Sequence, residues 1–353
     1  MKPAASHESR GPALLVVQTS FLGDVVLTTP LVSALRRRLV PRRLALLVRP
    51  EAVPLVAGHP DIDQVLVDDK RGADRGALGW LKTARRLSAE GFEVAVSPHR
   101  SLRTALVLAA ARIPRRVGFR ESRGAPFFHE RVPRARGRHD VERNLALLAP
   151  FGGAVEPPPL HVPVVPEAAR RAAELLPPGS GPLLGVAPGS AWATKRWAPE
   201  GFAAVIGALV GEGARCVVLG APDEAALAEE INRLAGGRAT VLAGRTDLAT
   251  MVAVVDRLAL LVANDSAPMH IACARGVPVV EVFCATTPAL GYGPWGPRAA
   301  VVEADLACRP CGRHGGRSCP RGTEDCMRLV RPGAVLAAAR AALGAAPAEV
   351  APR

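Results

Sequence analysis

Aromatic residues and long apolar runs are both scarce in this 353-residue chain. Aromatics make up 4% of the residues, with a single tyrosine, and no helix-turn-helix or RNA-binding motif is recognisable, which argues against a nucleic-acid-binding protein. No apolar run approaches the roughly 20 residues that a membrane-spanning helix needs. Residues 1–10 are polar and the apolar residues 13–17 are too few for a signal-peptide core, so we expect a cytoplasmic protein.

Two common nucleotide-binding signatures are also missing. The chain has neither a GxxxxGK(S/T) motif nor a GxGxxG motif after a predicted strand, which excludes P-loop NTPases and simple dinucleotide dehydrogenases. No internal sequence repeat is evident. Apolar residues, in contrast, are plentiful: 49% of the chain is hydrophobic, which is enough for the cores of two α/β domains.

Positive charge is concentrated in the first half of the chain. Residues 1–165 hold 26 Lys and Arg against 15 Asp and Glu, whereas residues 166–353 hold 19 against 17. Such an excess predicts an anionic partner, and the charge alone leaves open nucleic acid, a membrane surface or a phosphorylated substrate. The alternative is that a GC-rich genome places arginine on solvated faces, although this would not explain the nearly neutral second half.

Apolar segments and helical patterns alternate along the chain. Strands are predicted at residues 13–17, 44–48, 64–67, 92–96, 183–186, 216–219, 240–242, 258–262 and 278–283. This alternation predicts the α/β class, with two doubly wound Rossmann-like domains facing each other across a cleft. Prolines mark a linker at 166–182 between domains at 1–165 and 183–353, and the basic residues 115–138 are predicted to form loops.

Ligands of such sheets bind beyond the carboxyl ends of the strands, and one stretch at such an end is Asn264–His270. Asp265 and Ser266 end a strand and open a short helix, whose free N–H groups and positive dipole end suit a diphosphate. The alternative is that one of these two residues is simply the N-cap, with Pro268 tolerated in the first turn.

A second stretch of this kind follows the strand at residues 183–186. Ser190 is followed by Lys195 and Arg196 shortly before a helix, and two adjacent cations at that place favour diphosphate binding over a purely structural loop. Trp192 and Trp197 could stack on a base or a sugar, but each is expected to pack against the protein instead.

Two acidic residues also follow predicted strands. Asp24 is a candidate general base that takes a proton from an attacking hydroxyl, and Gly23 beside it lets the backbone approach a ligand. Alternatively, Asp24 caps a helix. Glu224 is a candidate acceptor of hydrogen bonds from ribose hydroxyls, although an acidic first helical turn has the same composition.

Four cysteines fall within 19 residues of a loop rich in Gly, Pro and Arg: Cys308, Cys311, Cys319 and Cys326. The CxxC spacing of the first pair makes the group a candidate structural zinc site. The second pair lacks that spacing, and reduced thiols or a disulfide are the alternatives. The remaining cysteines are expected in the core: Cys216, Cys273 and Cys284.

Together these segments resemble the family 9 glycosyltransferases, the ADP-heptose:lipopolysaccharide heptosyltransferases. The resemblance spans nearly the whole chain and rests on residues 19–24 with 28–30, 101–103 with 116–119, 188–190 with 195–197, 244–248, and 264–266 with 269–270. The cysteine cluster, followed by Met327, resembles the heptosyltransferase II branch.

The resemblance implies a GT-B fold, in which the second domain binds a nucleotide-sugar and the first receives the acceptor. It implies that Asp24 is the base of an inverting, direct displacement without an obligatory metal or cofactor. The implied donor-binding residues are Ser190, Lys195, Arg196, Glu224, Asp265, Ser266, Ala267 and His270. The expected partners are an ADP-sugar and an anionic lipid-linked oligosaccharide at the inner membrane face, where the enzyme would be peripheral.

One position departs from the family pattern. The family usually has Gly after Asp-Ser or Asp-Thr, whereas Ala267 stands here and Pro268 follows. The methyl group of Ala267 limits how closely a ligand approaches the backbone, and Pro268 removes one N–H donor. The donor sugar is therefore open to alternatives, namely another nucleotide-sugar used by a GT-B transferase or by an epimerase of similar fold.

Overall fold

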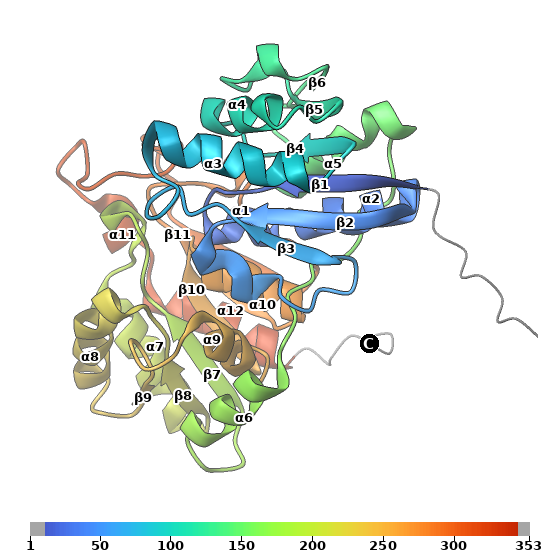
Figure 1. Ribbon diagram of the computed structural model, residues 1–353. Coiled ribbons are helices and arrows are strands. Elements are labelled where there is room, and N and C mark those ends of the chain that lie inside the picture. Colours follow the sequence, from blue (N-terminus) through green and yellow to red (C-terminus); the bar gives the residue numbers. More distant parts are fainter. Residues whose placement is uncertain (1–10, 345–353) are drawn as a thin grey trace, which may run out of the picture. The chain divides into compact units, whose positions relative to one another are not determined.

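The computed structural model describes residues 11–344 (Figure 1). The described chain divides into two compact units, one ending at Pro163 and the other beginning at Val164. The polar residues 1–10, on which the expectation about a signal peptide rests, lie outside the described residues, as do residues 345–353. Each unit is built on its own six-stranded sheet, so each is described separately.

The first unit has a sheet whose neighbouring strands all pair in parallel, in the order β3-β2-β1-β4-β5-β6. Its strands are β1 (Gly11–Val17), β2 (Pro41–Val48), β3 (Gln64–Val67), β4 (Val94–Ser97), β5 (Arg115–Phe119) and β6 (Glu130–Val132). Its helices are α1 (Leu22–Val26), α2 (Thr29–Leu39), α3 (Gly76–Ala89), α4 (Leu102–Ala110) and α5 (Asp140–Leu145). Short 3-10 turns lie at η1 (Pro50–Leu55), η2 (Ala125–Phe127) and η3 (Ala146–Phe151).

Apolar side chains pack on both faces of this sheet, as a parallel sheet requires. Leu15 and Leu47 of the sheet pack with Leu87 of α3 and Leu108 of α4, and all four are fully buried or nearly so. On β1, the residues between these inward positions are also buried, and α2 contacts that strand. The continuous apolar runs that predicted strands in the sequence therefore reflect burial from two sides.

The second unit has a parallel sheet in the order β12-β11-β10-β7-β8-β9. Its strands are β7 (Leu183–Ala187), β8 (Arg215–Val218), β9 (Thr240–Val241), β10 (Leu260–Asn264), β11 (Val279–Phe283) and β12 (Ala299–Glu303). Its helices are α6 (Pro166–Leu175), α7 (Pro199–Gly211), α8 (Ala225–Leu234), α9 (Leu248–Val255), α10 (Ala267–Arg275), α11 (Asp325–Arg328) and α12 (Pro332–Gly344). Short 3-10 turns lie at η4 (Ala193–Lys195), η5 (Pro222–Glu224) and η6 (Pro288–Leu290).

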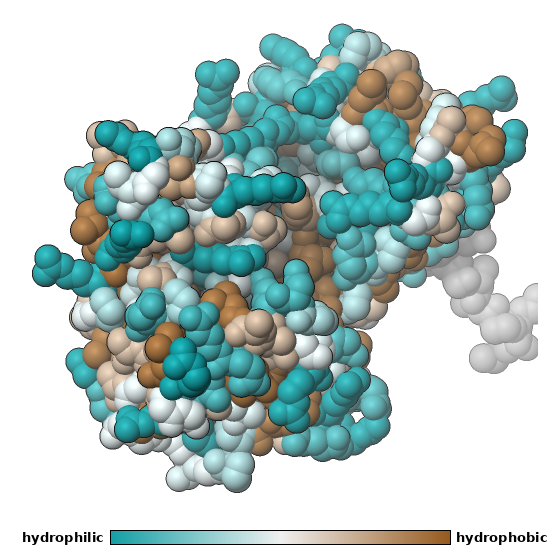
Figure 2. Space-filling model, turned by 90° about the vertical axis from the view of Figure 1, so that its left-hand side faces the viewer, coloured by the Kyte–Doolittle hydropathy of each residue, from teal (hydrophilic) through white to brown (hydrophobic). Residues whose placement is uncertain are grey.

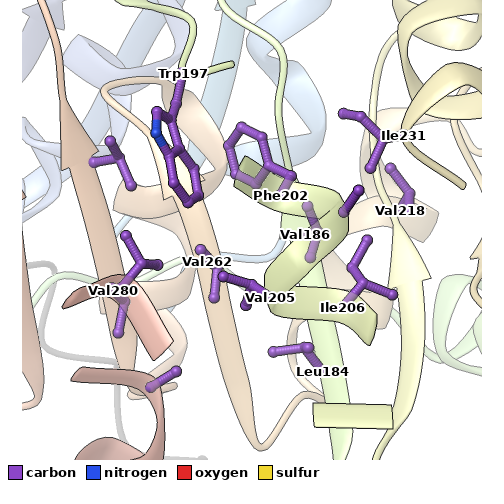
Figure 3. Packing of buried hydrophobic residues seen from close by; sticks show 14 of the residues in the cluster. Leu184, Val186, Trp197, Phe202, Val205, Ile206, Val218, Ile231, Val262 and Val280 are labelled. Carbon is purple, nitrogen blue, oxygen red and sulfur yellow. The ribbon is translucent and has the colours of Figure 1, made fainter. Parts of the chain in front are cut away.

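The core of the second unit lies between its sheet and the helices α7, α8 and α12. Phe202 and Ile206 of α7 pack against Val186 and Val262 of the sheet (Figure 3). Trp197, 3% exposed, joins the same cluster, with its ring 5.0 Å from that of Phe202. The prediction that Trp197 packs in the core is therefore confirmed.

The two sheets confirm the predicted α/β class with doubly wound parallel sheets. One prediction was wrong: residues 115–138, expected to be loops, contain β5 and β6, which extend the first sheet at its edge. The strand β12 was also not predicted. The proline-marked segment 166–182 contains α6, which packs against α9 within the second unit.

Both sheets share one topology. In each sheet, the strand that comes first along the chain is paired with the second strand on one side and with the fourth strand on the other. The chain therefore reverses its direction of winding between β1 and β4 in one unit and between β7 and β10 in the other. Ligands of doubly wound sheets bind at such a reversal, beyond the carboxyl ends of the strands, so each unit has one candidate ligand site at its reversal.

Hydrophilic residues predominate on the face of the molecule in Figure 2, and hydrophobic ones lie in small separate groups. Within residues 11–344, no helix combines the length and the apolar character needed to cross a bilayer.

Candidate functional site

The centre of the candidate site in the second unit is an ion pair between Lys195 and Asp265. Lys195 ends η4, in the loop after β7, and Asp265 follows β10. The Lys195 Nζ atom lies 2.6 Å from Asp265 Oδ2, and the two side chains are only 13% and 8% exposed. Thr286 donates a further hydrogen bond of 2.7 Å to the same carboxylate oxygen. The structure thus brings together two residues that lie 70 positions apart in sequence, beyond adjacent strands.

The start of α10 lies beside this pair and is not capped by a side chain. Ser266 occupies the N-cap position, but its hydroxyl donates to the carbonyl of Asn264 at 3.2 Å instead of accepting from the helix. The carboxylate of Asp265 is engaged by Lys195 and not by the helix. The side chains of Ser266 and Asp265 therefore do not cap the helix, in contrast to the capping alternative raised from the sequence. The positive end of the helix stays open to an anion.

The first turn of α10 contains both residues that depart from the family pattern. Ala267 is the first helical residue and Pro268 the second, where a missing N–H costs least. His270 follows, 5% exposed. The helix thus tolerates Pro268 without strain, while offering one N–H donor fewer at its start than the usual sequence would.

Asn264 ties together the two ends of the loop that contains Ser190. Its side-chain oxygen accepts from the Trp197 amide at 3.0 Å, and its side-chain nitrogen donates to the Pro188 carbonyl at 2.6 Å. Within the loop, the guanidinium of Arg196 donates twice to the Ser190 carbonyl, at 3.0 and 2.7 Å. Arg196 therefore stabilises the conformation of the loop. Lys195 is the cation that pairs with Asp265.

Glu224 reaches the same loop from the other side. Its Oε2 accepts from the Ala221 amide at 2.9 Å, so the capping interaction suggested by an acidic helical turn is present. Its carboxylate also lies directly against Gly189: a Cβ atom on residue 189 would lie only 1.9 Å from Oε1 of Glu224. Only glycine at position 189 allows this approach. Glu224 thus lies next to the loop that contains Ser190.

A buried carboxylic acid that sequence reasoning missed lies behind the ion pair. Glu281 on β11 is fully buried, and neither of its side-chain oxygens has a hydrogen-bond partner among the described residues. Burial, reinforced by the negative charge of Asp265, raises its pKa well above the usual value. A neutral Glu281 leaves Asp265 as the charged partner of Lys195. In the sequence, Glu281 is a single acidic residue within an otherwise apolar strand.

In the first unit, Asp24 lies in the first turn of α1. Its Oδ2 accepts from the Phe21 amide at 3.1 Å, so the helix-capping alternative describes one of its contacts. Its side chain is half-buried. One carboxylate oxygen in a capping contact leaves the carboxylate capable of accepting a proton from a bound hydroxyl.

A polar cluster that was not predicted surrounds the loop between β1 and α1. Lys70, after β3, donates to the Thr19 carbonyl at 2.5 Å. His99, after β4, shares hydrogen bonds through Nδ1 with the hydroxyls of Thr19 at 3.1 Å and Thr104 at 2.9 Å. Burial, followed by the charge of Arg49, lowers the pKa of Lys70 to about 8. Burial and the charge of Lys70 lower the pKa of His99 to about 3, so its ring is neutral near pH 7.

Arg49 and Arg103 add cationic charge at the same edge of the sheet. Arg49 directly follows β2 and is only 5% exposed. Its guanidinium pairs with Glu51 at 3.0 Å, and its Nε has no hydrogen-bond partner among the described residues. Burial lowers its pKa. Arg103 pairs with the buried Asp68 and donates to the Asp74 carbonyl at 2.9 Å. Crowded, partly desolvated cations of this kind favour an anionic ligand. The signal that could have found them is their place just after consecutive strands.

The described cysteines are all free thiols. Cys216 and Cys284 are buried, as expected for core residues, whereas Cys273 is only half-buried. Cys308, Cys311 and Cys319 lie half-buried in the loop after β12, and Cys326 is buried in α11. Across residues 11–344, no group of three or more His, Cys, Asp or Glu side chains is placed to hold a metal ion.

Comparison with known proteins places these features in context. Residues 80–318 match the sequence model of glycosyltransferase family 9 (heptosyltransferase). The chain is 28% identical to lipopolysaccharide heptosyltransferase 3 of Escherichia coli over 78% of this chain and 84% of the relative. It is 28% identical to lipopolysaccharide heptosyltransferase 1 of Pseudomonas aeruginosa, over 84% and 85% of the two chains.

Solved structures share the fold. A family 9 glycosyltransferase from Veillonella parvula superposes with a TM-score of 0.84 at 24% identity, covering 94% of this chain and 97% of that one. E. coli ADP-heptose lipopolysaccharide heptosyltransferase II superposes with a TM-score of 0.78 at 21% identity, covering 94% and 98%. These structures confirm the expected GT-B fold class.

Proposed function

Because the chain belongs to glycosyltransferase family 9, we propose that it transfers a heptose from ADP-heptose to the inner core of a lipopolysaccharide. The observation that supports this most directly is the open start of α10 beside Lys195. A helix N-terminus and a buried ammonium are the two elements that recognise a diphosphate. The similarity to heptosyltransferases of lipopolysaccharide synthesis supports the sugar and the acceptor class.

In the proposed donor site, Lys195 and the first turn of α10 hold the diphosphate, with Ser190 and Arg196 shaping the loop around it. Glu224 accepts hydrogen bonds from the ribose hydroxyls. Asp265 and Ser266, with Ala267 and His270 following them, lie against the diphosphate and the sugar. This assignment places every donor residue beyond a strand end of the second sheet.

In the proposed reaction, the acceptor hydroxyl oxygen attacks the anomeric carbon while the bond from that carbon to the diphosphate oxygen breaks. Asp24 takes the hydroxyl proton, and ADP leaves with its new negative charge facing Lys195. One displacement inverts the anomeric centre, and no covalent sugar–enzyme intermediate is formed. The ammonium and the helix dipole stabilise the leaving group, so we propose no requirement for a metal, and a chelator is expected to leave the rate unchanged.

The acceptor in this proposal is an anionic, lipid-linked oligosaccharide at the inner membrane face. Lys70 and Arg49, crowded together around Thr19 and Asp24, would hold a phosphate or carboxylate of the acceptor. The basic balance of residues 1–165 supports a surface that meets such a substrate. The enzyme would then be cytoplasmic and peripheral to that membrane.

The test is transfer from a panel of ADP-, UDP- and GDP-sugars to a core-truncated lipopolysaccharide, with the product read by mass spectrometry. Transfer of heptose from ADP-heptose alone supports the proposal. Transfer from another nucleotide-sugar would keep the glycosyltransferase and replace the donor, an outcome that Ala267 and Pro268 make worth including. Conversion of the donor without any acceptor would indicate an epimerase instead.

A further inference from the structure

Part of the cysteine-containing loop lies on the loop that holds Lys195. We call residues 304–316 the strap. The Thr194 amide donates to the Gly316 carbonyl at 3.2 Å, and the Gly316 amide donates to the Thr194 hydroxyl at 2.8 Å. Thr194 is 4% exposed. The residue that precedes Lys195 is therefore paired with the end of the strap through both its backbone and its side chain.

The strap also contacts the Lys195 side chain itself. Gly315 has φ of +75°, and a Cβ placed there would lie 3.2 Å from Lys195 Cγ and 3.0 Å from the Thr194 hydroxyl oxygen. The strap backbone thus packs on the aliphatic part of Lys195. A larger residue at position 315 would press on this side chain, which would have to shift by a few tenths of an ångström, and its own backbone would be strained.

Arg309 attaches the strap to the segment after β11, together with the Cys311 amide, which donates to the Ala285 carbonyl at 2.9 Å. The guanidinium of Arg309 donates to four backbone carbonyls and pairs with one carboxylate, and its side chain is only 4% exposed. The acceptors are the carbonyls of Phe283, Cys284, Thr286 and Ala304 and the side chain of Glu303. Arginine can reach this set because its planar group donates from three nitrogens, whereas lysine donates from one.

The attachments converge on the ion pair from both sides. The Ala285 amide donates to the Thr194 carbonyl at 3.2 Å, which joins the segment after β11 to the loop with Lys195. Thr286, whose carbonyl accepts from Arg309, donates its hydroxyl to Asp265. Each partner of the pair is thus supported by a threonine that the strap fixes.

We propose that the strap positions Lys195 for the donor diphosphate, with Thr194 and Arg309 as its positioning residues. This inference rests on the proposed function, because Lys195 is the cation assigned to the diphosphate. It gives the loop that bears the cysteines a task in donor binding through its backbone and Arg309, with no contribution required from the thiols.

The test compares Thr194→Val, which keeps the shape and removes the hydroxyl, with Thr194→Ser, which keeps the hydroxyl. A lost buried hydrogen bond that frees Lys195 is expected to weaken ADP binding by about tenfold in Thr194→Val, measured by calorimetry. Thr194→Ser is expected to stay within about twofold of wild type. Thr250→Val is the matched control, because Thr250 is equally buried in the second unit and bonds Asp247 at the start of α9.

A double-mutant cycle separates positioning from general stability. If Thr194 acts through Lys195, then Thr194→Val changes ADP affinity by less than about twofold in a Lys195→Ala background. An equal loss in both backgrounds would overturn the proposal, as would an unchanged affinity in the single variant. Arg309→Lys is expected to weaken ADP binding in the same direction as Thr194→Val.

A second readout does not depend on the nucleotide. The acylation rate of Lys195 by an amine-reactive ester, followed by peptide mass spectrometry, is expected to rise severalfold in Thr194→Val and not in Thr250→Val. If wild type fails to bind ADP, the proposed function fails and this rate still decides whether the strap holds Lys195. An unchanged rate would overturn the positioning role.

Discussion

The ammonium of Lys195 lies 2.6 Å from the carboxylate of Asp265, and both side chains are largely removed from solvent. In a buried ion pair each charge compensates the other, so removing one leaves the other uncompensated in the interior. A diphosphate entering beside α10 would therefore compete with Asp265 for Lys195. The ion pair with Asp265 fixes the position of the Lys195 ammonium.

Removing the charge of Lys195 is expected to weaken ADP binding and also to destabilise the fold, because Asp265 is left buried without its lysine partner. Lys195→Met keeps most of the aliphatic packing under Gly315 and deletes the charge, and the loss of a charge-assisted hydrogen bond predicts roughly 10- to 100-fold weaker ADP binding. Calorimetry gives the affinity and thermal unfolding gives the stability. Unchanged ADP affinity would remove Lys195 from the donor site.

Replacing Asp24 is expected to stop transfer while leaving the donor site intact. Asp24→Asn retains an oxygen that can accept from the Phe21 amide, so α1 keeps its cap, but the amide cannot take a proton. We expect transfer to fall by a factor on the order of 100 or more with ADP affinity unchanged. If Asp24→Asn transfers normally while Asp24→Ala is inactive and less stable, Asp24 serves only as a cap.

The pH dependence of acceptor binding is expected to report on Lys70. Its pKa of about 8 means that the ammonium is charged below pH 8 and neutral above it. Affinity for an anionic acceptor is therefore expected to fall as the pH rises through that range, and a bound anion would move the fall to higher pH. KM for the acceptor, measured between about pH 6.5 and 9.5, should show this step in wild type and lose it in Lys70→Met. A step that survives in Lys70→Met would have another origin.

Membrane association is expected to depend on anionic lipid and on salt. The positive balance of residues 1–165 predicts binding to vesicles that contain phosphatidylglycerol, and weaker binding as screening increases. Co-sedimentation at low and high ionic strength measures this, with neutral phosphatidylcholine vesicles as the control. Binding that ignores both lipid charge and salt would contradict an electrostatic contact.

Most strands could be predicted because a strand buried on two sides appears as a continuous apolar run. The strand β5 could not, because it begins with two arginines. The guanidinium of Arg115 lies 4.3 Å from the centre of the Phe151 ring, and that of Arg116 donates to the carbonyls of Ile113 and Phe127. Both arginines contact neighbouring residues from a strand that is paired on both sides, whereas their sequence suggests a solvated loop.

The residues of the candidate site could be predicted where they directly follow strands, and their contacts could not. Asp265 directly follows β10 and Lys195 lies in the loop after β7, yet nothing local indicates that they pair. The contact of Lys70 with Thr19 spans 51 positions, and those of Asn264 span 67 and 76. Arg309 was expected only as part of a cysteine-rich loop, because its acceptors are backbone carbonyls that no sequence pattern marks.

Because the two sheets have the same strand order, each strand of one unit has a counterpart at the same place in the other. The loop after the first strand holds Thr19 in one unit and Ser190 in the other, and the loop after the fourth holds His99 and Asp265. The basic cluster of the first unit and the ion pair of the second therefore occupy the same topological position, where the winding of each sheet reverses.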